Sequence, residues 1–201
     1  IEEVMRIYGY DNVEAGKMIC YTANHETDNT LVMAEEKIAS SLCGSGFHEI
    51  MSLSLSKESL YENNPSIIKV LNPLSSDLNV MRTDMIWSGL EAISYNLNRK
   101  SNDLKFFEFG RTYCLSEDPK FKYKEQKNLA LFITGKLFQE NPFGYNAVSD
   151  FAYIKSALQK IIEKFGVEDV KISESEYENF EFGLSFHSNR KLLAECGKVK
   201  S

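Results

Sequence analysis

The chain has 201 residues, of which 43% are hydrophobic and 26% are charged, so it can bury a core and is not a disordered chain. Its formal net charge of −6 and isoelectric point near 5.2 argue against a free-standing nucleic-acid binder, which needs clustered Lys and Arg to neutralise phosphates. Because it has neither an apolar run of membrane length nor a signal peptide, we expect a cytoplasmic protein without membrane contact.

The N-terminal part of the chain predicts two helices and a strand. Apolar residues recur at helical spacing over residues 1–8, and Gly9 follows as a terminator, so we expect the tail of a helix there. A linker with a short strand should follow over residues 11–23. The pattern of residues 28–42 predicts a second helix that the "GSG" at 44–46 ends. Alternation over residues 47–55 predicts a half-buried antiparallel strand.

The middle of the chain predicts a helix and two strands. Thr83 or Asp84 can cap a helix whose apolar residues continue to Leu97. "LKFFEF" at 104–109 and "LALFIT" at 129–134 read as strands, the second buried on both sides. The charged segment 117–127 between them should be a hairpin excursion or a mobile loop.

The C-terminal part predicts a helix that Ser149 or Asp150 starts and Gly166 ends, followed by strands near residues 171–172, 183–187 and 192–196. Consecutive strands without crossover helices favour an α+β fold, with a largely antiparallel sheet flanked by helices.

Cysteine and histidine give no sign of a metal or redox centre. The four cysteines form no C-x-x-C pair, and we expect most of them to fill the core: Cys20, Cys43, Cys114 and Cys196. The three histidines lack the spacing of metal ligands: His25, His48 and His187. The sequence also has no P-loop, no G-x-G-x-x-G and no G-x-S-x-G elbow.

Arg82, Glu108 and Arg111 form the one constellation that could bind an adenylate or a phosphate. Arg82 precedes a predicted helix N-terminus, where backbone N–H groups attract anions, and a guanidinium can clamp a phosphate. The alternative, which we favour, is structural: Glu108 and Arg111 can pair with each other or with Arg82 and tie the strand to the helix start.

Three stretches resemble the β subunit of bacterial phenylalanyl-tRNA synthetase. They are "IEEVMRIYGYDNV", "LNPLSSDLNVMRTDMIWSGLEAISYNLNRKSNDLKFFEFGRTY" and "SDFAYIKSALQKIIEKFG". The middle stretch is the most specific, because its N-P-L-S, R-T and F-E-F-G-R landmarks follow in the family's order. The resemblance implies a class II synthetase-like core over residues 13–201, truncated at its C-terminus. Residues 1–12 would be the last helix of a preceding winged-helix-like domain plus a linker.

The resemblance also implies that this core is not itself catalytic. In the family the α subunit uses ATP to activate phenylalanine, and the β core lacks the catalytic residues of that site. The strand equivalent to the ATP-binding motif 2 reads "FFEFGRTY", with Phe107 and Phe109 where polar ATP contacts would be expected. We therefore predict no catalytic or cofactor-binding residue in this chain.

The implied role is assembly. The domain would contact the α subunit in an α₂β₂ enzyme and help position tRNA(Phe), with residues 28–42 and 47–55 as the docking surface. The isolated chain could also pair with itself as a homodimer. The alternative function is an active adenylate-forming ligase on the same fold, with Arg82 and Arg111 on the phosphates.

Glu2 and Glu3 are adjacent carboxylates, whose simplest role is a solvated helix surface. In the resembled family this pair helps to bind Mg²⁺ together with aspartates located upstream of it. We therefore predict Glu2 and Glu3 as ligands of a magnesium site that is incomplete in this fragment.

Overall fold

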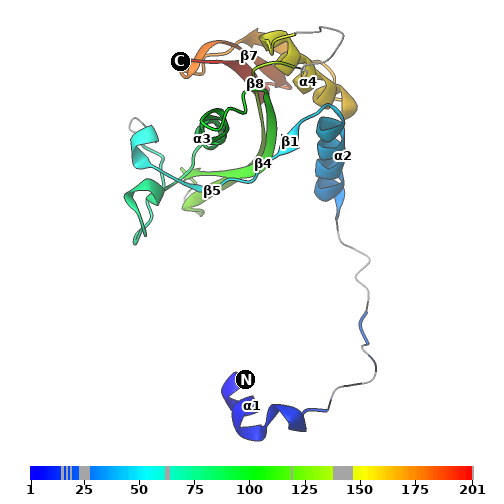
Figure 1. Ribbon diagram of the computed structural model, residues 1–201, viewed down its shortest axis with the longest axis vertical. Coiled ribbons are helices and arrows are strands. Elements are labelled where there is room, and N and C mark those ends of the chain that lie inside the picture. Colours follow the sequence, from blue (N-terminus) through cyan, green and yellow to red (C-terminus); the bar gives the residue numbers. More distant parts are fainter. Residues whose placement is uncertain are drawn as a thin grey trace. The chain divides into compact units, whose positions relative to one another are not determined.

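The computed structural model describes residues 1–14, 16, 18, 20–22, 28–61, 64–118, 120–137 and 147–200. The chain divides into two compact units, Ile1–Met33 and Ala34–Ser201, drawn in Figure 1. The first unit contains helix α1 (Glu2–Tyr8), which confirms the predicted N-terminal helix. Gly9, at φ 91°, ends this helix and a single 3-10 turn (Tyr10–Asn12) follows. The division expected after residue 12 stays a prediction.

The second unit contains three helices and eight strands within the described residues. The helices are α2 (Thr30–Gly44), whose first turn lies before the division, α3 (Ile86–Leu97) and α4 (Phe151–Lys164). The strands are β1 (His48–Glu49), β2 (Leu55–Ser56), β3 (Val80–Met81), β4 (Leu104–Leu115), β5 (Tyr123–Thr134), β6 (Lys171–Glu174), β7 (Phe180–Ser188) and β8 (Lys191–Val199). Two 3-10 turns, Glu58–Tyr61 and Ser76–Leu78, lie between β2 and β3.

The strands form three small sheets, ordered β1-β4-β5, β2-β3 and β6-β7-β8. Every pair is antiparallel except β1 with β4, which confirms a largely antiparallel α+β fold. The β4–β5 hairpin is longer than predicted, because pairing continues from Leu104↔Thr134 to Leu115↔Tyr123. Residues 123–127 of the charged segment 117–127 are therefore paired strand, held by backbone hydrogen bonds although their side chains are polar.

The single strand predicted over residues 47–55 is wrong. Only His48–Glu49 and Leu55–Ser56 are strands, because this segment passes from one sheet to another. It pairs with β4 at its start, where Ile50 N–H donates to the Phe107 carbonyl (2.8 Å), and with β3 at its end. The change of partner strand leaves no trace in the alternation of apolar and polar residues.

Two aspartates stabilise helix starts as predicted. The Asp150 carboxylate accepts from Tyr153 N–H (2.8 Å) at the N-cap of α4. Asp84 lies one residue before Met85, the N-cap of α3, and its carboxylate accepts from Ile86 N–H (2.9 Å). Each carboxylate thus gives a hydrogen-bond partner to a backbone N–H that the first helical turn would otherwise leave unpaired.

The two faces of the β4–β5 hairpin support separate parts of the core. On one face Phe107, with no exposed surface, packs with Leu42 of α2 and Phe47, and α4 contributes Tyr153, Ala157 and Ile161. On the other face Phe106 and Phe132 pack against α3. Figure 1 shows α2 and α3 on opposite sides of this hairpin.

The expectation that the cysteines are mostly core residues is wrong for two of the four. Cys196 is buried and Cys114 is half-buried, whereas Cys20 and Cys43 are exposed. In α2 the neighbouring Leu42 occupies the inward position, and successive helical residues point about 100° apart, which turns Cys43 to solvent.

Helix α3 approaches the sheet through Gly89. A Cβ at this position would lie 2.0 Å from Phe132 Cζ, so we expect Gly89→Ala to lower the free energy of unfolding by about 2 kcal/mol through overpacking. Gly44→Ala is the control, because a Cβ at the end of α2 meets nothing within 4 Å. Urea denaturation of both variants checks this, and equal stability of the two would contradict the close approach.

Candidate functional site

Arg82 and Glu108 form a buried ion pair, with Arg82 Nη1 3.0 Å from Glu108 Oε1. Arg82 directly follows β3, and Glu108 lies within β4 on the face opposite to Phe107. Only 3% of the Arg82 side chain and 2% of the Glu108 side chain remain exposed. A buried charge is costly unless it is paired and hydrogen-bonded, so the surroundings of this pair decide whether it is stable.

Ser52 completes the hydrogen bonding of the pair. Its hydroxyl lies 2.8 and 2.7 Å from the two oxygens of Glu108, and its backbone N–H donates to Glu108 Oε1 (3.3 Å). Arg82 Nη1 donates to Ser52 Oγ (2.8 Å) and Ser88 Oγ (3.3 Å), and Arg82 Nε donates to the Arg111 carbonyl (2.9 Å). Among the described residues, no buried side-chain nitrogen or oxygen lacks a hydrogen-bond partner.

The structure separates Arg111 from the other two predicted residues. Only its backbone carbonyl contacts Arg82, while its half-exposed side chain forms an ion pair with Glu125 on β5. Of the two pairings that the structural alternative left open, the structure has Glu108 with Arg82, and the Arg111 side chain takes no part in that pair. Sequence reasoning missed Ser52 and Gly110, over which Arg82 packs: a Cβ on Gly110 would lie 2.3 Å from Arg82 Nη2.

Phe107 and Phe109 lie in the core and not beside Arg82. Phe107 packs with Leu42 and Phe47, and Phe109 meets it edge-on with ring centroids 5.8 Å apart. Because alternate residues of a strand face opposite sides, the rings and Glu108 are separated by the sheet. The group that neutralises Arg82 is thus the Glu108 carboxylate, and the rings of Phe107 and Phe109 lie on the other face of the hairpin.

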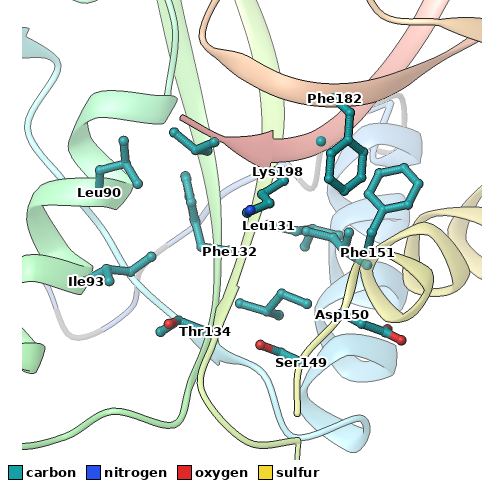
Figure 2. Close-up of a pocket in the computed structure, with 14 residues that line it drawn as sticks. Leu90, Ile93, Leu131, Phe132, Thr134, Ser149, Asp150, Phe151, Phe182 and Lys198 are labelled. Carbon is teal, nitrogen blue, oxygen red and sulfur yellow. The ribbon is translucent and has the colours of Figure 1, made fainter. Parts of the chain in front are cut away.

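An apolar cavity of about 410 Å³ lies between α3, the end of β5, the start of α4 and strands β7 and β8. Figure 2 shows Leu90, Ile93, Leu131, Phe132, Phe151 and Phe182 around it. Its charged groups are already engaged, since Asp150 caps α4 and Lys198 Nζ lies 2.6 Å from Glu181. The cavity can hold an apolar group but offers no acid–base pair.

A second, polar cavity of about 440 Å³ contains Asp84, Tyr61 and Tyr177. Burial raises the pKa of the Asp84 carboxyl, although backbone N–H groups of Ile86 and Trp87 and the charge of Arg82 lower it. Burial and then the charge of Asp84 raise the pKa of Tyr61 to about 12, and burial raises the pKa of Tyr177. Both phenols therefore stay protonated at neutral pH.

The predicted magnesium ligands do not form a metal site by themselves. Glu2 and Glu3 lie in the first turn of α1, and Glu3, 77% exposed, pairs with Arg6 at 3.4 Å. The described part of the chain has no group of three or more His, Cys, Asp or Glu that could hold a metal ion. His48 lies exposed on β1, His187 lies on β7, and His25 is outside the described residues.

Comparison with known proteins identifies the family. The chain matches the family described as phenylalanyl tRNA synthetase beta chain CLM domain over residues 18–199. The chain belongs to this family. The phenylalanine–tRNA ligase beta subunit of Bacteroides thetaiotaomicron is 35% identical over 99% of this chain and 26% of its own length. That of Porphyromonas gingivalis is 33% identical over 84% and 22%.

The chain therefore spans about a quarter of the length of these beta subunits. Two solved structures of the pyrrolysyl-tRNA synthetase of Desulfitobacterium hafniense share its fold, with TM-scores of 0.59 and 0.60 at 16% identity. They cover 82% of this chain and 55% or 57% of their own. The predicted class II synthetase-like fold is confirmed. No helix in the described residues is both long and apolar enough to cross a bilayer.

The buried pair predicts strong coupling between its two residues. Glu108→Gln leaves the Arg82 charge buried without a counter-charge, and we expect it to cost about 3 kcal/mol of unfolding free energy. Arg82→Met combined with Glu108→Gln should cost clearly less than the sum of the single changes. Arg111→Gln is the exposed control and should cost at most about 1 kcal/mol. Additive single and double variants in urea denaturation would contradict this.

The raised pKa of Asp84 predicts a pH-dependent effect on stability. A carboxyl whose folded pKa lies above its ordinary value of 3.8 binds a proton more readily in the folded state. The free energy of unfolding therefore falls as the pH rises from the ordinary pKa through the folded pKa. We expect Asp84→Asn, which keeps an acceptor for Ile86 N–H, to equal or exceed the parent in stability at pH 7. This difference should diminish toward pH 4. Thermal unfolding at both pH values measures it, and a difference that grows on acidification would contradict it.

Proposed function

We propose that this chain is a non-catalytic assembly domain of a phenylalanyl-tRNA synthetase β subunit. It binds the catalytic α subunit of an α₂β₂ enzyme and helps to position tRNA(Phe), while the α subunit uses ATP to join phenylalanine to the tRNA. The family match over residues 18–199 and the beta-subunit relatives support this proposal.

The engagement of Arg82 carries the non-catalytic part of the proposal. A nucleotide site needs a cation aimed at the phosphates, and the guanidinium of Arg82 is buried and bonded to Glu108, Ser52, Ser88 and the Arg111 carbonyl. Rotating it toward a phosphate would leave Glu108 as a buried unpaired carboxylate, which is strongly unfavourable.

The alternative is an adenylate-forming ligase that uses Arg82 and Arg111. Its remaining support is Arg111, whose exposed pair with Glu125 is weak enough to exchange for a phosphate. Lys127 lies opposite Arg111 on β5 but pairs with Glu35, and Arg111 alone is a poor phosphate clamp. The alternative is therefore the less favoured function.

Exposed apolar side chains in the predicted docking segments support the assembly role. Met51 is 96% exposed and Leu53 is 65% exposed, between the two short strands of segment 47–55. On α2, three consecutive residues are also more than half exposed: Leu31, Val32 and Met33. Such residues gain by burial against another protein surface. We take residues 51 and 53, and separately residues 31–33, as candidate contacts of the α subunit.

Glu2 and Glu3 remain proposed magnesium ligands in the full enzyme. Two exposed carboxylates, one of them paired with Arg6, supply at most part of a coordination shell. Carboxylates from elsewhere in the enzyme would complete it, and in the full enzyme the ion would add positive charge at this end of α1.

Purified chain alone should show no phenylalanine-dependent ATP/pyrophosphate exchange and no calorimetric ATP binding, yet should co-sediment with the α subunit. Met51→Asp with Leu53→Asp should weaken that association by about tenfold or more, because charge replaces apolar contact. Phe121→Asp, a control 65% exposed in the β4–β5 turn, should leave it unchanged.

Sedimentation of the chain alone also tests whether the same surface forms a homodimer. Robust pyrophosphate exchange by the isolated chain would contradict the non-catalytic role. Association with α that is unaffected by the Met51 and Leu53 changes would contradict the proposed contact while leaving the non-catalytic role in place.

A further inference from the structure

The polar cavity of about 440 Å³ is built from three segments that are far apart in sequence. Its residues come from the 3-10 turn at Glu58–Tyr61, the start of α3 and the connection between β6 and β7. The lining residues are Ser59, Leu60, Tyr61, Asn64, Pro65, Thr83, Asp84, Trp87, Tyr177, Glu178 and Asn179. It is separate from the apolar cavity of Figure 2, with which it shares no lining residue.

Three aromatic rings contribute to this wall: Tyr61, Trp87 and Tyr177. Tyr61 is only 6% exposed, and its hydroxyl hydrogen-bonds with Ser56. The Tyr177 hydroxyl accepts from Asn179 Nδ2 (3.2 Å). Hydrogen bonding to neighbours fixes both phenols in place, which leaves the rings as a rigid surface. Ring faces carry partial negative charge and attract cations.

The charged groups of the wall all have one sign. Asp84 and Glu178 line the cavity, and no Lys, Arg or His is among the described residues that line it. Arg82 lies close enough for its charge to act on Asp84, but it is buried and paired with Glu108. The ammonium of Lys200 donates to the backbone carbonyl of Glu178 without lining the cavity. Asp84 is close enough to both phenols for its charge to raise the pKa of Tyr61 and of Tyr177.

We propose that this cavity binds a primary ammonium group, with the Asp84 carboxylate as its counter-ion and the rings of Tyr61, Trp87 and Tyr177 as its cation–π wall. The ligand is a small amine, and the site is independent of the function proposed above. Three more oxygens line the cavity: the Thr83 hydroxyl, which accepts from Asn64 Nδ2, the Asn64 side-chain oxygen, which accepts from Ser66 N–H, and the Asn179 side-chain oxygen. Each oxygen has two lone pairs, so each can also accept from an ammonium.

Helix capping alone explains only part of this arrangement. Asp84 accepts from Ile86 N–H (2.9 Å), and this bond requires neither burial nor aromatic neighbours. The carboxylate is instead largely removed from water within an acidic pocket, at a cost that its bonds to the helix start do not offset. A bound cation would offset that cost directly. The cavity should therefore bind a cation in preference to an uncharged molecule of the same shape.

Trp87 is the only tryptophan in the chain, so its fluorescence reports on this cavity alone. We expect n-butylammonium to change it saturably and to release heat in calorimetry, while 1-butanol, of similar size and uncharged, does neither. Asp84→Asn should weaken binding by roughly tenfold or more, since a charge-assisted contact becomes a neutral one. Asp77→Asn, the same change at an exposed 3-10 turn, should leave it unchanged.

Nα-acetyl-lysine N-methylamide tests whether the ammonium comes from a lysine side chain or from a free amine, and tighter binding of either compound supports the site. If Asp84→Asn fails to fold by circular dichroism, Tyr177→Leu replaces it and should weaken binding several-fold through loss of the ring. Absence of saturable binding, equal response to 1-butanol, or unchanged affinity in a folded Asp84→Asn or Tyr177→Leu variant would overturn the proposal. These readouts involve no aminoacylation, so they remain distinct from tests of the assembly role.

Discussion

The buried pair of Arg82 and Glu108 is the interaction on which the centre of the second unit depends. It joins the residue after β3 to the middle of β4. Hydrogen bonds with Ser52 and Ser88 also connect it to the segment between β1 and β2 and to α3. Two charges in the interior are stable only because each is neutralised and hydrogen-bonded by the other and by fixed neighbours. The pair therefore adds little net stability. Its main effect is to fix the position of β4 relative to the segments around it.

This arrangement has a direct consequence for chemistry. A cation that completes a buried network cannot also hold a phosphate, because its departure would strand Glu108. The chain can thus keep the class II synthetase-like fold of its family while Arg82 completes a buried ion pair in the protein interior. Exposed apolar groups such as Met51 bury little surface within this chain, which is why we propose them as contacts for another subunit.

Local features of the fold were predictable from the sequence, and features set by distant contacts were not. The helix starts at Asp84 and Asp150 follow from capping chemistry within a few residues. The change of partner strand between His48 and Ser56 and the extension of β5 depend on backbone pairing, which side-chain patterns do not encode. For the site, Arg82 and Glu108 were identifiable as charged residues in apolar surroundings. Ser52 and Gly110 were not, since only the folded chain brings them to the guanidinium.

We propose that the Arg82 guanidinium is committed to Glu108 and that β4 therefore carries no nucleotide site. A crystal structure of the chain grown with saturating Mg²⁺ and ATP tests this most directly. We expect Arg82 to stay bonded to Glu108 and Ser52, with no ordered triphosphate in contact with β4. A triphosphate ordered against Arg82 or Arg111, with the Arg82–Glu108 bond broken, would contradict it.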